Sequence, residues 1–181
     1  MLKVCLPVAA VVSLLALQAC RGPAETAVEP EGAAPTERLP ATAHAADPLA
    51  AAQLKDGFYG LEENAWRWTA GRFTVVLGIP EGAAEYGAVL SLRFSLPDAI
   101  LARLGPVTLS TAVSGVELEP QTFTQPGLHI YERRVPAEAL AGDTAKVEFR
   151  TDKAIPPSEA DRRELALIFV SASLRRAPAC D

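Results

Sequence analysis

The chain of 181 residues carries 17 lysines and arginines against 22 aspartates and glutamates, a formal net charge of −5 at pH 7. This acidic balance, without a stripe of basic residues, argues against nucleic acid as a partner. Two histidines and three cysteines show no metal-ligand spacing, so we expect neither a metal centre nor a cofactor.

The first nineteen residues have the layout of a secretory signal peptide. Lys3 provides a positive start, residues 4–17 form an apolar run, and small Ala19 precedes Cys20. The final tetrapeptide, Leu-Gln-Ala-Cys, resembles a bacterial lipobox. That resemblance implies cleavage before Cys20, a lipid on its thiol, and contact with a membrane through this anchor. Arg21 is not the aspartate of enteric-type inner-membrane retention, which implies the periplasmic face of the outer membrane.

Two alternatives to lipidation compete with this anchor. A transmembrane helix needs about 20 apolar residues, and the apolar run is shorter than that. Ordinary cleavage would leave Cys20 as a free thiol, able to pair with Cys180 in an oxidising periplasm. With a lipid on Cys20, Cys180 would be a leftover thiol near the C-terminus.

Residues 20–48 are expected to form a disordered tether behind the lipidated cysteine. They contain many prolines, alanines and glutamates, and no aromatic residue. Such a segment cannot bury enough apolar surface to offset its chain entropy. The tether would hold a folded domain, residues 49–181, at a distance from the membrane.

This domain has the pattern of an all-β protein. Residues 89–96 alternate strictly between apolar and polar side chains, which predicts a half-buried strand. Further strands are predicted at 72–79, 107–113, 128–135, 145–150 and 165–174, and a short helical turn at 98–104. Ser114-Gly115 predicts a hairpin turn. Seven to nine short strands with regular turn signals predict a single β-sandwich of jelly-roll type.

Two segments stand out from the strand pattern. The first begins at Gly57-Phe58 and passes Glu62 to reach Trp66-Arg67-Trp68-Thr69, and the second is residues 161–166. Together they resemble a β-sandwich module of bacterial cell-envelope proteins that is often attached to glycan-handling enzymes. The resemblance covers about residues 55–175. It implies a galactose-binding-like sandwich without an established catalytic centre.

One interpretation of these segments is a ligand site. Trp66 would stack its ring on a sugar, while Glu62 and Arg67 would form hydrogen bonds with the sugar hydroxyls. We keep these three as candidate ligand-binding residues. Trp66 and Trp68 would share one face of a strand, so burial of one would favour burial of the other.

The other interpretation is structural. Trp68 would begin a core strand, and Arg67 or Arg163 would form an ion pair with Glu62 or Asp161, fastening a loop to the edge of the sandwich. We favour this structural role for Trp68, Asp161 and Arg163.

The domain offers little sign of a catalytic set. His129 stands alone in a strand, no Gly-x-Ser-x-Gly motif occurs, and neighbouring carboxylates such as Glu62 and Glu63 would point to opposite faces. We therefore expect a lipid-anchored, non-catalytic envelope protein whose sandwich binds cell-envelope glycan. The alternatives are a protein-interaction or assembly factor of an envelope complex, and an envelope hydrolase using Glu62 or Asp161.

Overall fold

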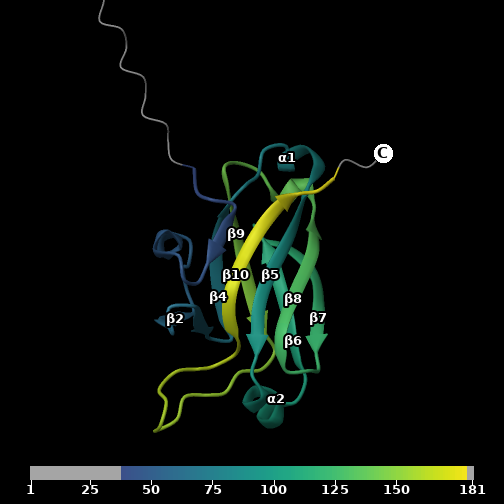
Figure 1. Cartoon of the computed structure of the whole chain (residues 1–181). Helices are drawn as coiled ribbons and strands as arrows, with labels where there is room; N and C mark the ends of the chain where they lie inside the picture. Colours follow the sequence, from purple (N-terminus) through teal and green to yellow (C-terminus); the bar gives the residue numbers. More distant parts are fainter. Residues whose placement is uncertain (1–37, 179–181) are drawn as a thin grey trace, which may run out of the picture. The chain divides into compact units, whose positions relative to one another are not determined.

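The structure is a computed structural model that describes residues 38–178. Its strands are β1 (Thr42–His44), β2 (Phe58–Glu62), β3 (Trp66–Thr69), β4 (Arg72–Gly78), β5 (Ala88–Leu96), β6 (Val107–Val113), β7 (Val116–Phe123), β8 (Gly127–Val135), β9 (Thr144–Thr151) and β10 (Ile168–Arg176). Helices α1 (Ala83–Tyr86) and α2 (Asp98–Leu104) and the 3-10 helices η1 (Pro48–Ala52) and η2 (Ala137–Ala139) lie in the connections (Figure 1). The predicted signal segment, Cys20, most of the tether and Cys180 lie outside residues 38–178.

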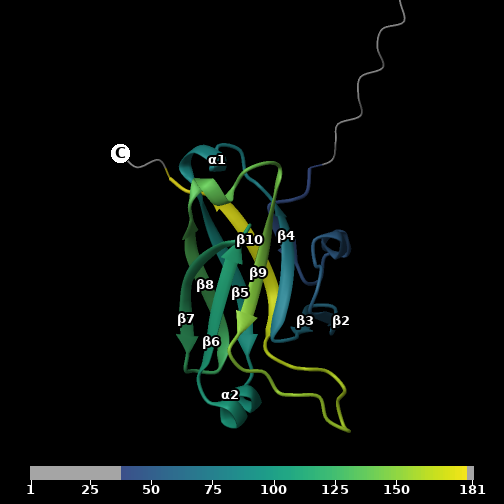
Figure 2. The same ribbon diagram turned by 180° about the vertical axis from the view of Figure 1, so that it is seen from behind.

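The strands form two antiparallel sheets that pack face to face. One, here the β10 sheet, has the order β2-β3-β10-β5-β8, with β1 also paired to β10. The other, the β9 sheet, has the order β4-β9-β6-β7. Figure 1 shows the β10 sheet in front, and Figure 2 shows the β9 sheet from the opposite side. The predicted all-β single sandwich is confirmed.

The core lies between the sheets and follows the period-two alternation. In β5, Leu90, Leu92, Phe94 and Leu96 point inward and are at most 1% exposed. Phe73, Phe149 and Phe169 stack or meet edge to face between the sheets. Each such side chain contributes about 1.5–3 kcal/mol through burial. β10 lies between β3 and β5, as its apolar start predicts.

The folded part begins earlier than the expected boundary at residue 49. β1 pairs with Ser171–Ser173 of β10, and Ala43 and Ala45 are fully buried. β3 pairs with β10 only at Ile168 and Phe169, which leaves the rest of that edge of β10 for β1. The end of the predicted tether is therefore part of the sheet. A segment this short, between prolines, shows no period-two signal of its own.

Two connections can be compared directly with the sequence predictions. Ser114 and Gly115 both have positive φ, 48° and 88°, as a two-residue β6–β7 hairpin of type I′ requires. β10 begins later than residue 165, because Leu165 pairs with Ile155 within the β9–β10 connection.

No helix within residues 38–178 is long and apolar enough to cross a membrane.

Candidate functional site

The second sequence motif lies on the loop between β9 and β10, and it is fastened to β2. Arg163 Nη1 donates to Glu62 Oε1 at 2.7 Å, and Arg163 Nη2 donates to Asp161 Oδ2 at 2.8 Å. The guanidinium also lies over the Tyr59 ring, 5.6 Å from its centroid. The Glu164 backbone N–H donates to Tyr59 Oη at 3.0 Å. We call Glu62, Tyr59, Asp161 and Arg163 the Arg163 cluster.

The Arg163 cluster has the electrostatics of a charge-assisted fastening. Hydrogen bonds from the Arg163 side chain, and then from its backbone, lower the pKa of Asp161 from its ordinary value. The bonds to Asp161 and Glu62 raise the pKa of Arg163. Arg163 therefore stays charged and carries a carboxylate on each side. Of the ion pairs considered from the sequence, the structure contains those that Arg163 makes with Glu62 and with Asp161.

The remaining motif residues also make contacts within the fold. Arg67 donates from Nε to the Ala45 carbonyl and from Nη1 to the Tyr59 carbonyl, both at 3.1 Å. Trp66 and Trp68 meet edge to face at 6.2 Å, and both are half-buried. Trp68 packs against the core. The structure thus brings Glu62, Trp66 and Arg67 to the β2–β3 edge, and their assignment to a ligand stays a prediction.

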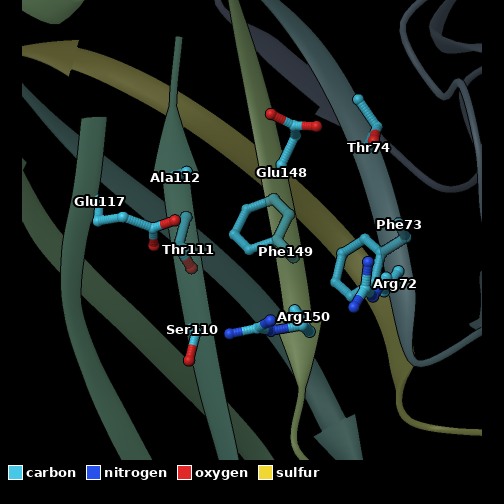
Figure 3. A pocket seen from close by; sticks show the side chains of 10 residues that line it. All are labelled: Arg72, Phe73, Thr74, Ser110, Thr111, Ala112, Glu117, Glu148, Phe149 and Arg150. Atoms are coloured by element: carbon cyan, nitrogen blue, oxygen red, sulfur yellow. The ribbon is translucent and has the colours of Figure 1, made fainter. Parts of the chain in front are cut away.

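A second region lies on the outer face of the β9 sheet, where three hollows adjoin. The central hollow, of about 230 Å³, is lined by Arg72, Phe73, Thr74, Ser110, Thr111, Ala112, Glu117, Glu148, Phe149 and Arg150 (Figure 3). A hollow of about 390 Å³ shares Arg72, Ser110 and Arg150 with it. A third, of about 630 Å³, shares Thr74. We call the three together the sheet-face trough.

Side-chain size explains the hollow. β6 places small Ser110 and Ala112 on the outer face, while the strands beside it carry longer charged residues. In register, Ser110 faces Arg150 of β9, and Ala112 lies between Glu148 of β9 and Glu117 of β7. Figure 3 shows Arg150 and Glu117 extending toward β6 from opposite sides. The trough therefore has a floor of small residues between charged walls.

Five of the ten charged side chains that line the trough form hydrogen bonds or ion pairs within the protein. Lys146 Nζ lies 2.7 Å from Glu148 Oε1. Asp152 accepts from the Thr108 backbone N–H, and Glu164 accepts from that of Gly71. Lys153 donates to the Pro106 carbonyl.

Five charged side chains of the trough differ from these. Arg72, Arg150 and Glu117 beside the central hollow, and Lys55 and Asp56 in the third, are exposed, and none of them forms an ion pair or side-chain hydrogen bond with another residue of the described part. Their polar groups are free to bind a ligand.

Sequence reasoning missed the trough. Arg72 and Arg150 lie in segments predicted to be strands, but each looks there like an ordinary solvent-facing residue. Only the pairing of β4 with β9 places Arg72 opposite Arg150. No local motif carries that register.

The described residues contain no group of three or more His, Cys, Asp or Glu side chains that could hold a metal ion. His129, the histidine in a strand, donates one hydrogen bond from Nε2 to the Gln125 carbonyl at 2.8 Å and lies against Phe94 and Phe123. It has no carboxylate partner there.

Comparison with known proteins gives matches only among solved structures. No family model and no curated protein matches the sequence. A carbohydrate-binding module, CBM36-1, of a xylanase from the hindgut metagenome of Trinervitermes trinervoides is 10% identical, with a TM-score of 0.44 over 76% of this chain and 98% of that one. A mannan-recognising module, TmCBM27, is 9% identical, with a TM-score of 0.42 over 76% and 96%.

An enzyme of family GH115, a 4-O-methyl-α-glucuronidase, is 13% identical with a TM-score of 0.49. The match covers 71% of this chain and only 17% of the enzyme's length. The solved structures similar to the chain thus include carbohydrate-binding modules with a β-sandwich fold. Similarity at this level carries no information on a ligand of this chain.

Proposed function

We propose that the chain is a lipid-anchored, non-catalytic protein of the cell envelope whose sandwich binds glycan in the sheet-face trough. One observation carries the proposal: hydrogen-bonding side chains that the fold does not use line an open trough with a floor of small residues. The anchor and the envelope location rest on the sequence around Cys20.

The chemistry of the trough suits a hydroxyl-rich ligand. A sugar hydroxyl both donates and accepts hydrogen bonds, and the trough offers the donors of Arg72 and Arg150, the acceptors of Glu117, and the hydroxyl of Ser110. The central hollow, about 230 Å³, is smaller than a typical enclosed small-molecule site of about 300–1,000 Å³. Its neighbours extend it along the sheet. The shape suits an extended saccharide chain better than one compact molecule.

Blocking the trough floor tests this proposal. Detergent-solubilised full chain is applied to an array of bacterial-envelope polysaccharides, alongside Ser110→Trp and Ser91→Trp. Both serines are partly buried and lie on outer faces, Ser110 on the β9 sheet and Ser91 on the β10 sheet. We expect Ser110→Trp to lose binding and Ser91→Trp to retain it. No binding by the unmodified chain, or equal binding by both variants, would contradict the proposal.

Trp66→Ala separates the trough from the β2–β3 edge. Trp66, Glu62 and Arg67 would bind the ligand if the sugar stacked on that edge. A loss of glycan binding in Trp66→Ala, with Ser110→Trp unaffected, would move the site from the trough to this edge. We expect the reverse, because Arg67 and Glu62 already hold the fold together.

The anchor is tested by intact-mass analysis of the membrane-extracted protein. We expect a chain that begins at Cys20 and carries acyl groups. A mass that matches cleavage without acylation would overturn the anchor, whatever the outcome for glycan binding.

A specific observation supports the alternative of a protein-interaction factor. Leu128 and Ile130 are 58% and 55% exposed, and both lie on β8, the edge strand of the β10 sheet. Exposed apolar side chains on an edge strand favour contact with another protein. A photo-crosslinker at Ile130 in intact cells tests this: a protein adduct at Ile130, together with an empty glycan array, would favour the alternative.

A further inference from the structure

We propose that Arg72 and Arg150 form an anionic subsite within the sheet-face trough, which binds the carboxylate of an acidic sugar unit such as a uronate. This inference rests on the proposed function and names its ligand class. It concerns the point at which the central hollow meets its 390 Å³ neighbour, because both arginines line both hollows. A chain that runs along the trough passes this point.

The register places the two arginines directly opposite each other. Arg72 of β4 pairs with Arg150 of β9 in an antiparallel ladder. Opposite residues of such a ladder have Cβ atoms about 4.5–5.5 Å apart, and like charges in this position destabilise the sheet. Both side chains are exposed and are on the same face. The fold therefore tolerates a repulsive pair that an anion between them would relieve.

No nearby carboxylate within the described residues forms an ion pair with Arg72 or Arg150. Glu148 lies two residues before Arg150 on the same face of β9, but its Oε1 is 2.7 Å from Lys146 Nζ. Glu164 and Asp152 accept hydrogen bonds from the backbone of Gly71 and Thr108. Glu117 lies on β7, two strands from β9 across β6, or about 10 Å at the usual strand spacing. Within residues 38–178, both guanidinium groups therefore keep their hydrogen-bond donors for a ligand.

Arginine chemistry favours a carboxylate over a neutral hydroxyl. A guanidinium presents its N–H donors as a planar fork that matches the two oxygens of a carboxylate, and these charge-assisted bonds are about twice as strong as neutral ones. Two guanidinium groups on one side, with the acceptor Glu117 on the other, also give the trough a polarity. The carboxylate would bind at the arginines and a hydroxyl of the same chain at Glu117.

The test compares a polymer that carries carboxylates with its matched neutral form and with a sulfated polymer. The full chain in detergent is titrated with polygalacturonate, with its carboxyl-reduced form and with dextran sulfate, at low and at physiological salt. The variants are Arg72→Gln and Arg150→Gln, with Arg93→Gln as control. Arg93 is likewise an exposed arginine on an outer sheet face, but on β5 of the β10 sheet, opposite Ile130. Chemical unfolding of each variant verifies that it is folded.

We expect polygalacturonate to bind at physiological salt, and its carboxyl-reduced form to bind about tenfold more weakly or worse. Arg72→Gln and Arg150→Gln should each cause a similar loss for polygalacturonate, while Arg93→Gln should not.

Four results would overturn the inference. Equal binding of the reduced polymer, or unchanged binding in both arginine variants, would exclude the anionic subsite and leave glycan binding in place. Equal or tighter binding of dextran sulfate with the same arginine dependence would exclude the assignment to a carboxylate. Absence of binding to every neutral and acidic polysaccharide would remove the proposed function and, with it, the subsite.

Discussion

Arginines occur in two contrasting settings in this sandwich. In the Arg163 cluster, one guanidinium binds two carboxylates and lies over a tyrosine ring. On the outer face of the β9 sheet, Arg72 and Arg150 lie opposite each other, and within the described residues neither forms an ion pair with a carboxylate. The ion pairs of Arg163 are formed within the protein, whereas we propose that Arg72 and Arg150 pair with an anionic ligand.

The conspicuous sequence motif and the unpaired hydrogen-bonding groups therefore lie in different parts of the sandwich. The motif with the tryptophans and Arg163 joins β2 to the β9–β10 loop, so its polar groups are engaged in the fold. The two arginines of the trough lie in ordinary strand segments and have free hydrogen-bonding capacity. We therefore expect substitutions in the Arg163 cluster to change stability, and substitutions of Arg72 and Arg150 to change binding.

The largest effect is expected at Gly57, which lies at the start of β2 against the backbone of Arg72. Its φ is +78°, and a Cβ there would lie 1.9 Å from the Arg72 carbonyl oxygen. Gly57→Ala should lower the free energy of unfolding by about 2 kcal/mol or more, because it adds backbone strain and a clash with backbone that cannot rotate away. Urea denaturation measures this.

Gly60→Ala is the control, since Gly60 lies three residues later, within β2, with no atom within 4 Å of the position of a new Cβ. Equal stability of the two variants would contradict the close approach of Gly57 to the Arg72 backbone at the start of β4. It would also show that the segment before β2 does not pack tightly against Arg72.

Arg163→Met should have the next largest effect. The Arg163 side chain is 34% exposed, so solvent weakens its two ion pairs. We expect the free energy of unfolding to fall by about 1–2 kcal/mol, because Glu62 and Asp161 lose their shared donor. Arg162→Met, at the exposed neighbouring position, should change it little. Similar denaturation midpoints for the two variants would show that the Arg163 cluster does not hold the loop.

The pH dependence of stability should show a smaller effect from the same cluster. The pKa of Asp161 is lowered in the folded protein, mainly by the side chain of Arg163. A lowered pKa stabilises the fold at pH values above the unfolded value, and this contribution disappears as the pH falls from about 4 through the folded pKa. Asp161→Asn should therefore flatten the stability profile in that window. Urea denaturation across this window measures the effect, and a profile for Asp161→Asn identical to that of the unmodified chain would refute the assignment.

The smallest effect, of opposite sign, is expected at the arginine pair. Arg72→Thr removes the cross-strand repulsion and introduces a good strand former, so the free energy of unfolding should rise by a few tenths of a kcal/mol. Arg93→Thr, which relieves no such pair, serves as the reference. A clear loss of stability in Arg72→Thr would indicate that Arg72, like Arg163, is needed for the fold, and the contrast between the two regions would disappear.

Much of the fold follows from local patterns in the sequence. The strict alternation of residues 89–96 predicts β5, and the apolar start of the last strand predicts its central place. Ser114-Gly115 predicts the β6–β7 hairpin, because few residues adopt two consecutive positive φ angles. These signals are local: alternation reports which face is buried, and turn residues report where the chain reverses. Local patterns do not predict β1, because its pairing depends on an edge of β10 that β3 leaves open.

The sequence by itself thus determined the all-β class, most strands, one hairpin turn and the small set of carboxylates that an arginine of the motif would bind. It also carries the basis for the proposed anchor at Cys20. The tertiary structure decided that Arg163 is the arginine between Glu62 and Asp161, and that Arg72 lies opposite Arg150 beside the small residues of β6. The physical reason is register. Which side chains meet across strands far apart in sequence depends on how the whole sandwich buries its apolar faces, and no single segment encodes it.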